Sequence, residues 1–264
     1  MRKLLFALTI TVFSSCSSFY QLYNVDTEDL KIEGKDMIYE NEHCKITYNL
    51  WGLYGDLSFA MYNKTDKDLF VVMPQSFFIK NGYAYNYYSN SERIERTSIA
   101  SSAGNIKTTS AWDILITKLS GNASLTESSR ITKVEELVCI PPHSKKIFNG
   151  FLLINEVHKE CEDYDFNYPK SKSDKITFNK DNSPWKYRNR IAYTFNAKEW
   201  NCKYVDNELW VSSLENYRDK FITRTFEIKE CETGYEDEQV IILYSAPNAF
   251  YNNYYKTPGA KNKE

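Results

Sequence analysis

Glycine is scarce in this chain, with nine residues among 264, and histidine is scarcer still, with three. Loops that cradle phosphates need closely spaced glycines, and the sequence contains no such loop. It also has no G-x-S-x-G nucleophile elbow, no H-E-x-x-H motif and no EF-hand loop. These absences favour a protein that is not an enzyme, and they give no reason to expect a cofactor.

An excess of charge of one sign is also lacking, because 33 basic residues stand against 35 acidic ones. Nucleic-acid binding depends on a concentrated basic surface, so we expect no nucleic-acid partner. The apolar run at residues 4–13 covers ten residues, whereas a membrane-spanning helix needs about 20. No later segment is apolar enough to span a bilayer.

The first residues have the order of a bacterial lipoprotein signal. Two basic residues precede the apolar run, two serines follow it, and Cys16 stands directly after them. Small residues mark the cleavage point of secretory signals, and the lipoprotein signal places its acylated cysteine there, although Phe13 replaces the usual leucine. We expect residues 1–15 to be removed and Cys16 to be lipidated. Residues 16–35 would then form a tether to the outer membrane or cell surface, or to the periplasmic face of a membrane.

Five cysteines remain once Cys16 is acylated, namely Cys44, Cys139, Cys161, Cys202 and Cys231. An extracytoplasmic compartment permits disulfides, and an odd count leaves at least one thiol unpaired. Cys139, His143, His158 and Cys161 form a candidate zinc set, because thiolate and imidazole are the ligands that tetrahedral zinc prefers. A disulfide between Cys139 and Cys161 across the same hairpin is the alternative.

The chain is rich in aromatic residues, with 21 Tyr, 15 Phe and 5 Trp, and these favour strands. Residues 44–50 and 57–62 alternate between apolar and polar side chains with the period of a half-buried strand. Asn81-Gly82 is a strong hairpin signal. Short strands at this spacing predict an all-β fold, and we expect an immunoglobulin-like β-sandwich elaborated by long insertions.

One β-rich domain is expected over residues 36–255, followed by a polar tail at 256–264. Residues 89–130 contain 15 Ser or Thr among 42 and read as a surface insertion. The polar stretch 156–182 is either another surface segment or the boundary between two small β domains. Further apolar patterns predict a buried strand within 147–154 and a pair of strands at 222–228 and 239–244. Residues 208–221 fit either a strand or a helix, because four large apolar residues recur there at helical spacing.

An aromatic tract supplies the candidate binding residues Tyr83, Tyr85, Tyr87 and Tyr88. Sugars stack on exposed aromatic rings, so the tract suits a glycan-binding module. The alternative is that alternate rings fill the core and the others cover their cross-strand neighbours. A third possibility is an accessory protein that binds an envelope partner through its long polar insertion.

Seven short segments resemble a family of Bacteroidales-type lipoproteins. They are CSSFYQLY at 16–23, ITYNLW at 46–51, YNKTD at 62–66, SFFIKNG at 76–82, IPP at 140–142, SPW at 183–185 and NRIAY at 189–193. The resemblance implies a surface or periplasmic lipoprotein of a Gram-negative bacterium, and it implies no active site. We therefore expect a lipid-anchored, non-catalytic binding or structural lipoprotein of the cell envelope.

Overall fold

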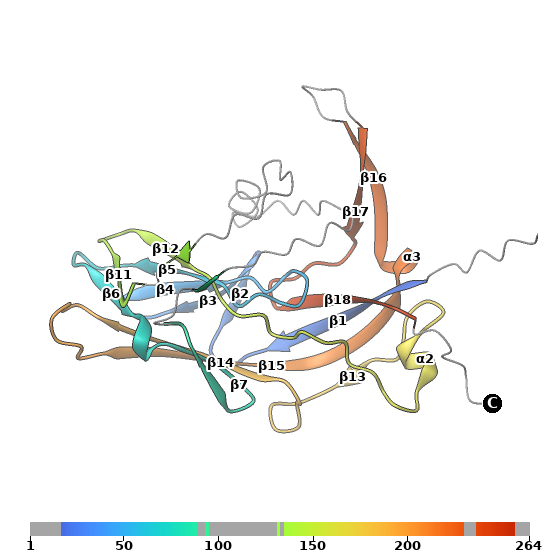
Figure 1. The fold of residues 1–264 in the computed structure, drawn as a ribbon, viewed down its shortest axis with the longest axis horizontal. Helices are drawn as coiled ribbons and strands as arrows, with labels where there is room; N and C mark the ends of the chain where they lie inside the picture. The colour runs from blue at the N-terminus through green and yellow to red at the C-terminus, as the bar shows by residue number, and fades with distance from the viewer. Residues whose placement is uncertain (1–16, 89–92, 95–130, 133–134, 230–235, 257–264) are drawn as a thin grey trace, which may run out of the picture.

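The chain folds into two antiparallel β-sheets that pack face to face (Figure 1). The computed structural model describes residues 17–88, 93–94, 131–132, 135–229 and 236–256. The expected signal (1–15), Cys16, nearly all of the insertion 89–130 and the tail from 257 lie outside this part. Among the described residues, no helix is long and apolar enough to cross a membrane.

The larger sheet has nine strands, six of which follow the order β11-β6-β14-β15-β1-β18. Of the other three, β7 pairs with β14, β8 pairs with β7, and β13 pairs with β15. Its strands are β1 (Ser18–Asp26), β6 (Leu69–Val72), β7 (Phe77–Lys80), β8 (Tyr83–Asn86), β11 (Leu137–Ile140), β13 (Ile176–Thr177), β14 (Lys186–Thr194), β15 (Lys203–Arg218) and β18 (Ala249–Tyr255).

The smaller sheet has five strands in the order β12-β5-β4-β3-β2. They are β2 (Lys31–Glu33), β3 (Asp36–Glu40), β4 (Cys44–Tyr48), β5 (Phe59–Asn63) and β12 (Lys145–Phe148). One continuous hydrophobic core joins the two sheets, with Ile46 and Met61 from the smaller and Ile191 and Val205 from the larger. The predicted all-β sandwich is confirmed.

Two local patterns that were read from the sequence are confirmed. In β4 the side chains of Cys44, Ile46 and Tyr48 are buried while those between them are not. The hairpin between β7 and β8 turns at Asn81 and Gly82, whose φ angles are 49° and 85°. Two positive φ angles define the turn type whose twist matches paired strands, and Asn-Gly tolerates it best.

The prediction of a tether at residues 16–35 is wrong for β1, which lies inside the larger sheet. β1 pairs with β15 along one edge and with β18 along the other. Its residues Phe19, Leu22, Tyr23 and Val25 are all buried. The misreading has a physical cause: these apolar residues do not alternate strictly, because the strand is covered on both faces, so the period-2 signal is missing.

Residues 208–221 are a strand up to Arg218, because β15 continues for 16 residues. Only then does the chain form the short helix α3 (Asp219–Ile222). Pairing decides the conformation, since β15 pairs with β14 from Lys203 to Trp210 and with β1 from Trp210 to Arg218. The helical spacing of its large residues was therefore accidental.

The polar stretch 156–182 does not separate two domains. It contains the helix α2 (Tyr164–Asn167) and the strand β13, which pairs with β15 of the larger sheet. Buried amide groups attach the stretch to that sheet: the Asn216 side chain donates to the Phe166 carbonyl over 2.7 Å, and Gln21 donates to the His158 carbonyl over 2.8 Å.

The apolar run 147–154 is a regular strand only to Phe148. The backbone at Gly150 lies so close to Leu57 that a Cβ atom there would be 2.1 Å from the Leu57 carbonyl carbon. Glycine is thus required by this close approach, and it interrupts the expected strand.

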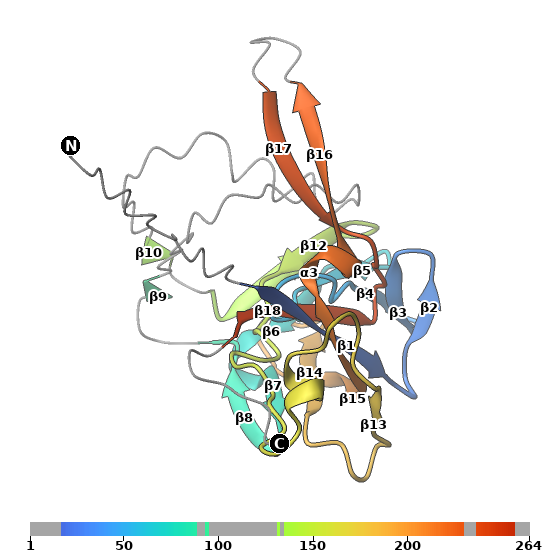
Figure 2. The ribbon, with the colours of Figure 1, turned by 90° about the vertical axis from the view of Figure 1, so that its right-hand side faces the viewer.

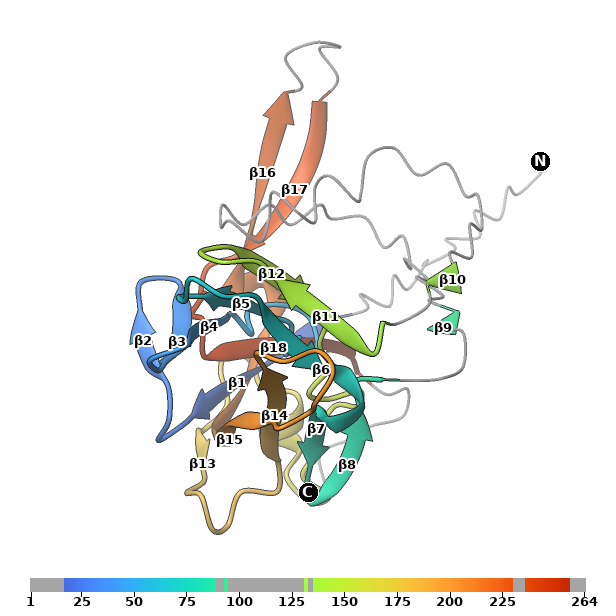
Figure 3. The same ribbon diagram turned by 90° about the vertical axis from the view of Figure 1, so that its left-hand side faces the viewer.

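Two further strand pairs stand apart from the sandwich sheets. The predicted pair near the C-terminus forms as β16 (Thr223–Lys229) and β17 (Glu236–Ile242), which project from the body as a long hairpin (Figure 3). β9 (Arg93–Ile94) pairs with β10 (Ile131–Thr132) at the two ends of the Ser/Thr-rich segment. A 3-10 turn, η1 (Met73–Gln75), links β6 to β7.

Candidate functional site

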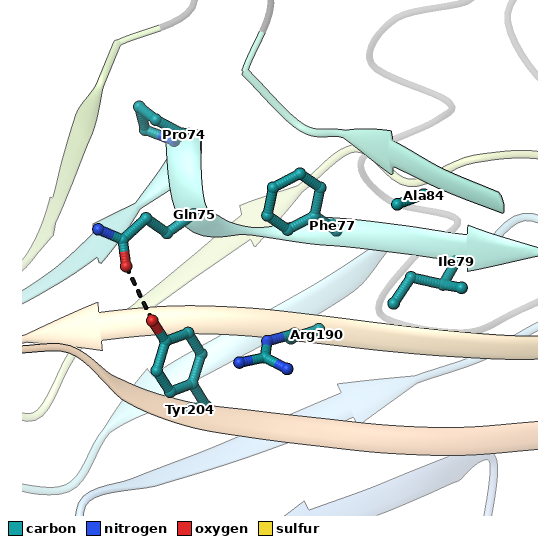
Figure 4. A pocket seen from close by; sticks show the side chains of 7 residues that line it. All are labelled: Pro74, Gln75, Phe77, Ile79, Ala84, Arg190 and Tyr204. Carbon is teal, nitrogen blue, oxygen red and sulfur yellow. Dashed lines mark hydrogen bonds between the residues drawn. The ribbon is translucent and has the colours of Figure 1, made fainter. Parts of the chain in front are cut away.

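A shallow pocket of about 360 Å³ opens on the outer face of the larger sheet, away from the core (Figure 4). Its size is at the lower end of the range for small-molecule sites. The lining residues come from η1, β7, β8, β14 and the start of β15, and they are Pro74, Gln75, Phe77, Ile79, Ala84, Arg190 and Tyr204.

Strand alternation places these side chains on one face. Phe77 stands opposite Arg190 across the β7–β14 ladder, while their neighbours Phe78 and Asn189 are buried on the core side. Ala84 stands opposite Ile79 in the β7–β8 hairpin. Apolar side chains thus form one wall of the pocket and polar groups form the other.

The polar wall is built around Tyr204, whose ring is half exposed. The Arg190 guanidinium lies over this ring, 4.4 Å from its centroid, and the Tyr204 hydroxyl donates to Gln75 Oε1 over 2.8 Å (Figure 4). Guanidinium groups stack well on aromatic faces and carry several donors in one plane. The arrangement therefore presents a cation, a carboxamide and aromatic edges beside an apolar surface.

A ladder of charge pairs continues from the pocket along β14 and β15. Arg188 holds Asp206 in a two-point contact, with Nη2–Oδ2 and Nε–Oδ1 distances of 2.5 and 2.9 Å. The hydrogen bond to Asp206 raises the pKa of Arg188 above its usual value. Arg190 lies 3.7 Å from the same carboxylate. Asp206 is thus held mainly by Arg188, and Arg190 keeps its stacked position over Tyr204.

The tyrosine tract is divided between surface and core. Tyr83 is 74% exposed and Tyr85 is 47% exposed, whereas Tyr87 is only 6% exposed. The Tyr87 hydroxyl donates to Asn189 Oδ1 over 2.9 Å, and the Tyr88 hydroxyl donates to Glu136 over 3.1 Å. Two of the four candidate rings are therefore accessible, and Tyr87 belongs to the core.

The four residues of the candidate zinc set do not come together. The His143 ring nitrogen contacts Asp66 at 2.8 Å, and the His158 ring nitrogen contacts Glu160 at the same distance. No cluster of three or more potential metal ligands occurs among the described residues. Cys139 and Cys161 are free thiols, so the alternative disulfide is not formed either.

Sequence reasoning missed a polar network inside the sandwich. The Tyr48 hydroxyl donates to Asn207 Oδ1 over 2.9 Å and accepts from Asn189 Nδ2 over 3.1 Å. Both asparagines are fully buried, and Asn189 also accepts from Tyr87. The only available signal was the alternation of Asn189 with Arg188 and Arg190, which are partly exposed, and this places Asn189 on the core side of β14. This network ties the two sheets together and is closed to ligands.

Comparison of the chain with protein families, with curated proteins and with solved structures finds no match.

Proposed function

We propose that this protein is a lipoprotein of the cell envelope, anchored through acyl chains on Cys16 to the outer membrane or cell surface, and that its β-sandwich is a non-catalytic binding domain. The order of residues 1–16 carries the proposal: a basic start, ten apolar residues, two serines and a cysteine. More than one acyl chain is needed for stable anchoring, and lipoprotein cysteines of this type carry three.

The pocket supports a role in binding. Its seven lining residues include no carboxylate, imidazole or thiol, which are the usual general acids, general bases and strong nucleophiles. They do include the donors of Arg190, the amide of Gln75 and the phenol of Tyr204. Such a set fits a ligand that has an apolar face and hydrogen-bond acceptors.

Metabolic labelling with a fatty acid tests the anchor. We expect the wild-type protein to incorporate label and to sediment with membranes, and Cys16→Ser to lose both properties. Label retained by Cys16→Ser, or membrane retention without label, would refute lipid anchoring at this residue.

Glycan binding is the second candidate, and the exposure of Tyr83 and Tyr85 favours it. Phe78 and Phe151 lie behind Tyr85 with ring centroids 6.0 and 6.1 Å away, which holds the exposed ring in place. Rings of this kind provide stacking surfaces for sugars.

A glycan array with matched variants separates the two surfaces. Loss of binding in Tyr83→Ala and Tyr85→Ala, with binding kept in Tyr255→Ala, would assign the glycan to the tract. Loss in Arg190→Gln alone would assign it to the pocket. A wild-type protein that binds no glycan on the array would remove this candidate.

A further inference from the structure

β1 begins at Ser18, two residues after Cys16. Two residues of chain span at most about 7 Å. β1 is also fixed in place, because Ser18 pairs with Tyr255 and Phe19 pairs with both Arg218 and Tyr254. Only Ser17 therefore lies between β1 and the proposed site of acylation.

This short distance limits where the domain can lie on a membrane. Subtracting the hydrocarbon core from the whole bilayer leaves roughly 5–8 Å for each headgroup layer. If the acyl chains on Cys16 enter the hydrocarbon, Ser18 must lie at or near the headgroups. The inference thus rests on the proposed function.

The surface around the first residues of β1 is suited to that position. Figure 2 shows this end of the molecule, where β1 begins beside α3 and the end of β18. Phe221 in α3 is 51% exposed, and Tyr255 at the end of β18 is 59% exposed. Lys220 lies over the Phe221 ring at 5.0 Å, so a cation accompanies an exposed ring.

Hydrogen bonds hold α3 against the start of β1. The Ser18 hydroxyl donates to Asp219 Oδ2 over 2.6 Å, and Arg218 donates to the Ser17 hydroxyl over 3.4 Å. The one acidic group of α3 is therefore turned toward the chain, while Lys220 and Phe221 are exposed.

We propose that this end, defined by Arg218, Lys220, Phe221, Tyr255 and Lys256, docks on the headgroup layer of the bilayer that holds the acyl chains. Tyrosine rings concentrate at the membrane interface, phenylalanine rings enter the headgroup boundary, and lysine and arginine side chains are attracted to anionic headgroups. The partner is the lipid surface itself, engaged as a second contact beside the acyl chains.

Docking at this end fixes what faces away from the membrane. Tyr204 lies fourteen residues before Arg218 on the same strand, and a strand rises about 3.3 Å per residue, so at most roughly 45 Å of strand separates the two. The lipid-docked protein would hold the pocket of Arg190 and Tyr204 far from the bilayer, open to ligands.

Quenching by brominated acyl chains tests the proposal on the full lipidated protein. Phe221→Trp and, separately, Tyr255→Trp place a fluorophore at the docking end, and Tyr204→Trp is the matched control at the distant end. The vesicles contain phosphatidylcholine with a minor share of phosphatidylglycerol. We expect the added fluorescence, relative to the parent protein, to be quenched at 221 and 255 and to be unchanged at 204.

The outcomes separate this inference from the proposed function. Protein that floats with vesicles but shows no quenching at 221 or 255, or equal quenching at 204, would overturn the docked orientation and leave the lipid anchor standing. Protein that carries no acyl chain and does not float would overturn the anchor. Unacylated protein that still floats with vesicles and is quenched at 221 would overturn the anchor and support the docking surface.

Discussion

Removing one hydroxyl from each of two buried tyrosines is expected to lower the stability of the protein at one position and to preserve or raise it at the other. Tyr48 and Tyr187 both lie in the core and are 0% and 2% exposed. The Tyr48 hydroxyl makes two hydrogen bonds, to Asn207 and from Asn189. The Tyr187 hydroxyl is buried without a hydrogen-bond partner in the described part of the chain. Burial raises the pKa of both phenols, so both are neutral at any ordinary pH.

The magnitudes follow from what each substitution leaves behind. Tyr48→Phe leaves the Asn207 acceptor and the Asn189 donor without this partner, and each buried polar group left unpaired costs about 1–3 kcal/mol. The free energy of unfolding should therefore fall by about 2–6 kcal/mol in Tyr48→Phe. Tyr187→Phe removes a buried polar group that has already lost its water, so stability should stay constant or rise by about 1 kcal/mol.

Urea unfolding followed by tryptophan fluorescence measures both effects in the Cys16→Ser protein. With a slope of about 2–3 kcal/mol per molar urea, Tyr48→Phe should lower the midpoint by about 1–3 M. Tyr187→Phe should leave the midpoint in place or raise it. A loss in Tyr187→Phe as large as that in Tyr48→Phe would refute the assignment of these hydrogen bonds.

Three other perturbations test single features of the fold. Burial raises the pKa of Glu215, but its contacts with Lys172 at 2.7 Å and with Tyr217 outweigh burial and lower the pKa overall. The ionised carboxylate therefore stabilises the fold above pH ~4.5, and this stabilisation is lost as the pH falls through the lowered pKa. Lys172→Met should weaken this loss of stability at acid pH. Gly150→Ala should cost at least ~3 kcal/mol by thermal unfolding, because its Cβ would overlap the backbone. Burial raises the pKa of Cys44 to about 12, so maleimide should modify it only on unfolding, and rapid modification in native buffer would contradict its burial.

Local signals in the sequence predicted the strands that have one covered face. The alternation in β4 and the Asn81-Gly82 turn depend on neighbouring residues alone, so both could be identified without the structure. β1 and the second half of β15 could not, because these two segments pair with each other across nearly 200 residues, and β1 pairs with the still more distant β18. A central strand that is covered on both faces lacks the alternation of apolar and polar residues by which a half-exposed strand is identified in a sequence.

The candidate sites were harder to predict than the fold. Tyr83 and Tyr87 look alike in sequence, yet one is exposed at the sheet edge and the other is buried beneath the smaller sheet. The pocket depends on Gln75, Arg190 and Tyr204, which come from three separate segments. The spacing of residues along the chain does not show that these three side chains lie together. Spacing also suggested a zinc site whose four candidate ligands are not clustered in the described part of the fold.

The position of β1 also constrains how the protein can be made. Its two neighbours, β15 and β18, lie far along the chain, and β18 ends at Tyr255. Because synthesis starts at the N-terminus, β1 is made before the other strands, and its edges stay unpaired until almost the whole chain is complete. Contacts of such long range make folding slow and leave an unpaired strand open to aggregation. Loss of β18 through an early stop codon should therefore yield insoluble or degraded protein rather than a shortened domain, and chaperone demand should be highest while β1 is unpaired.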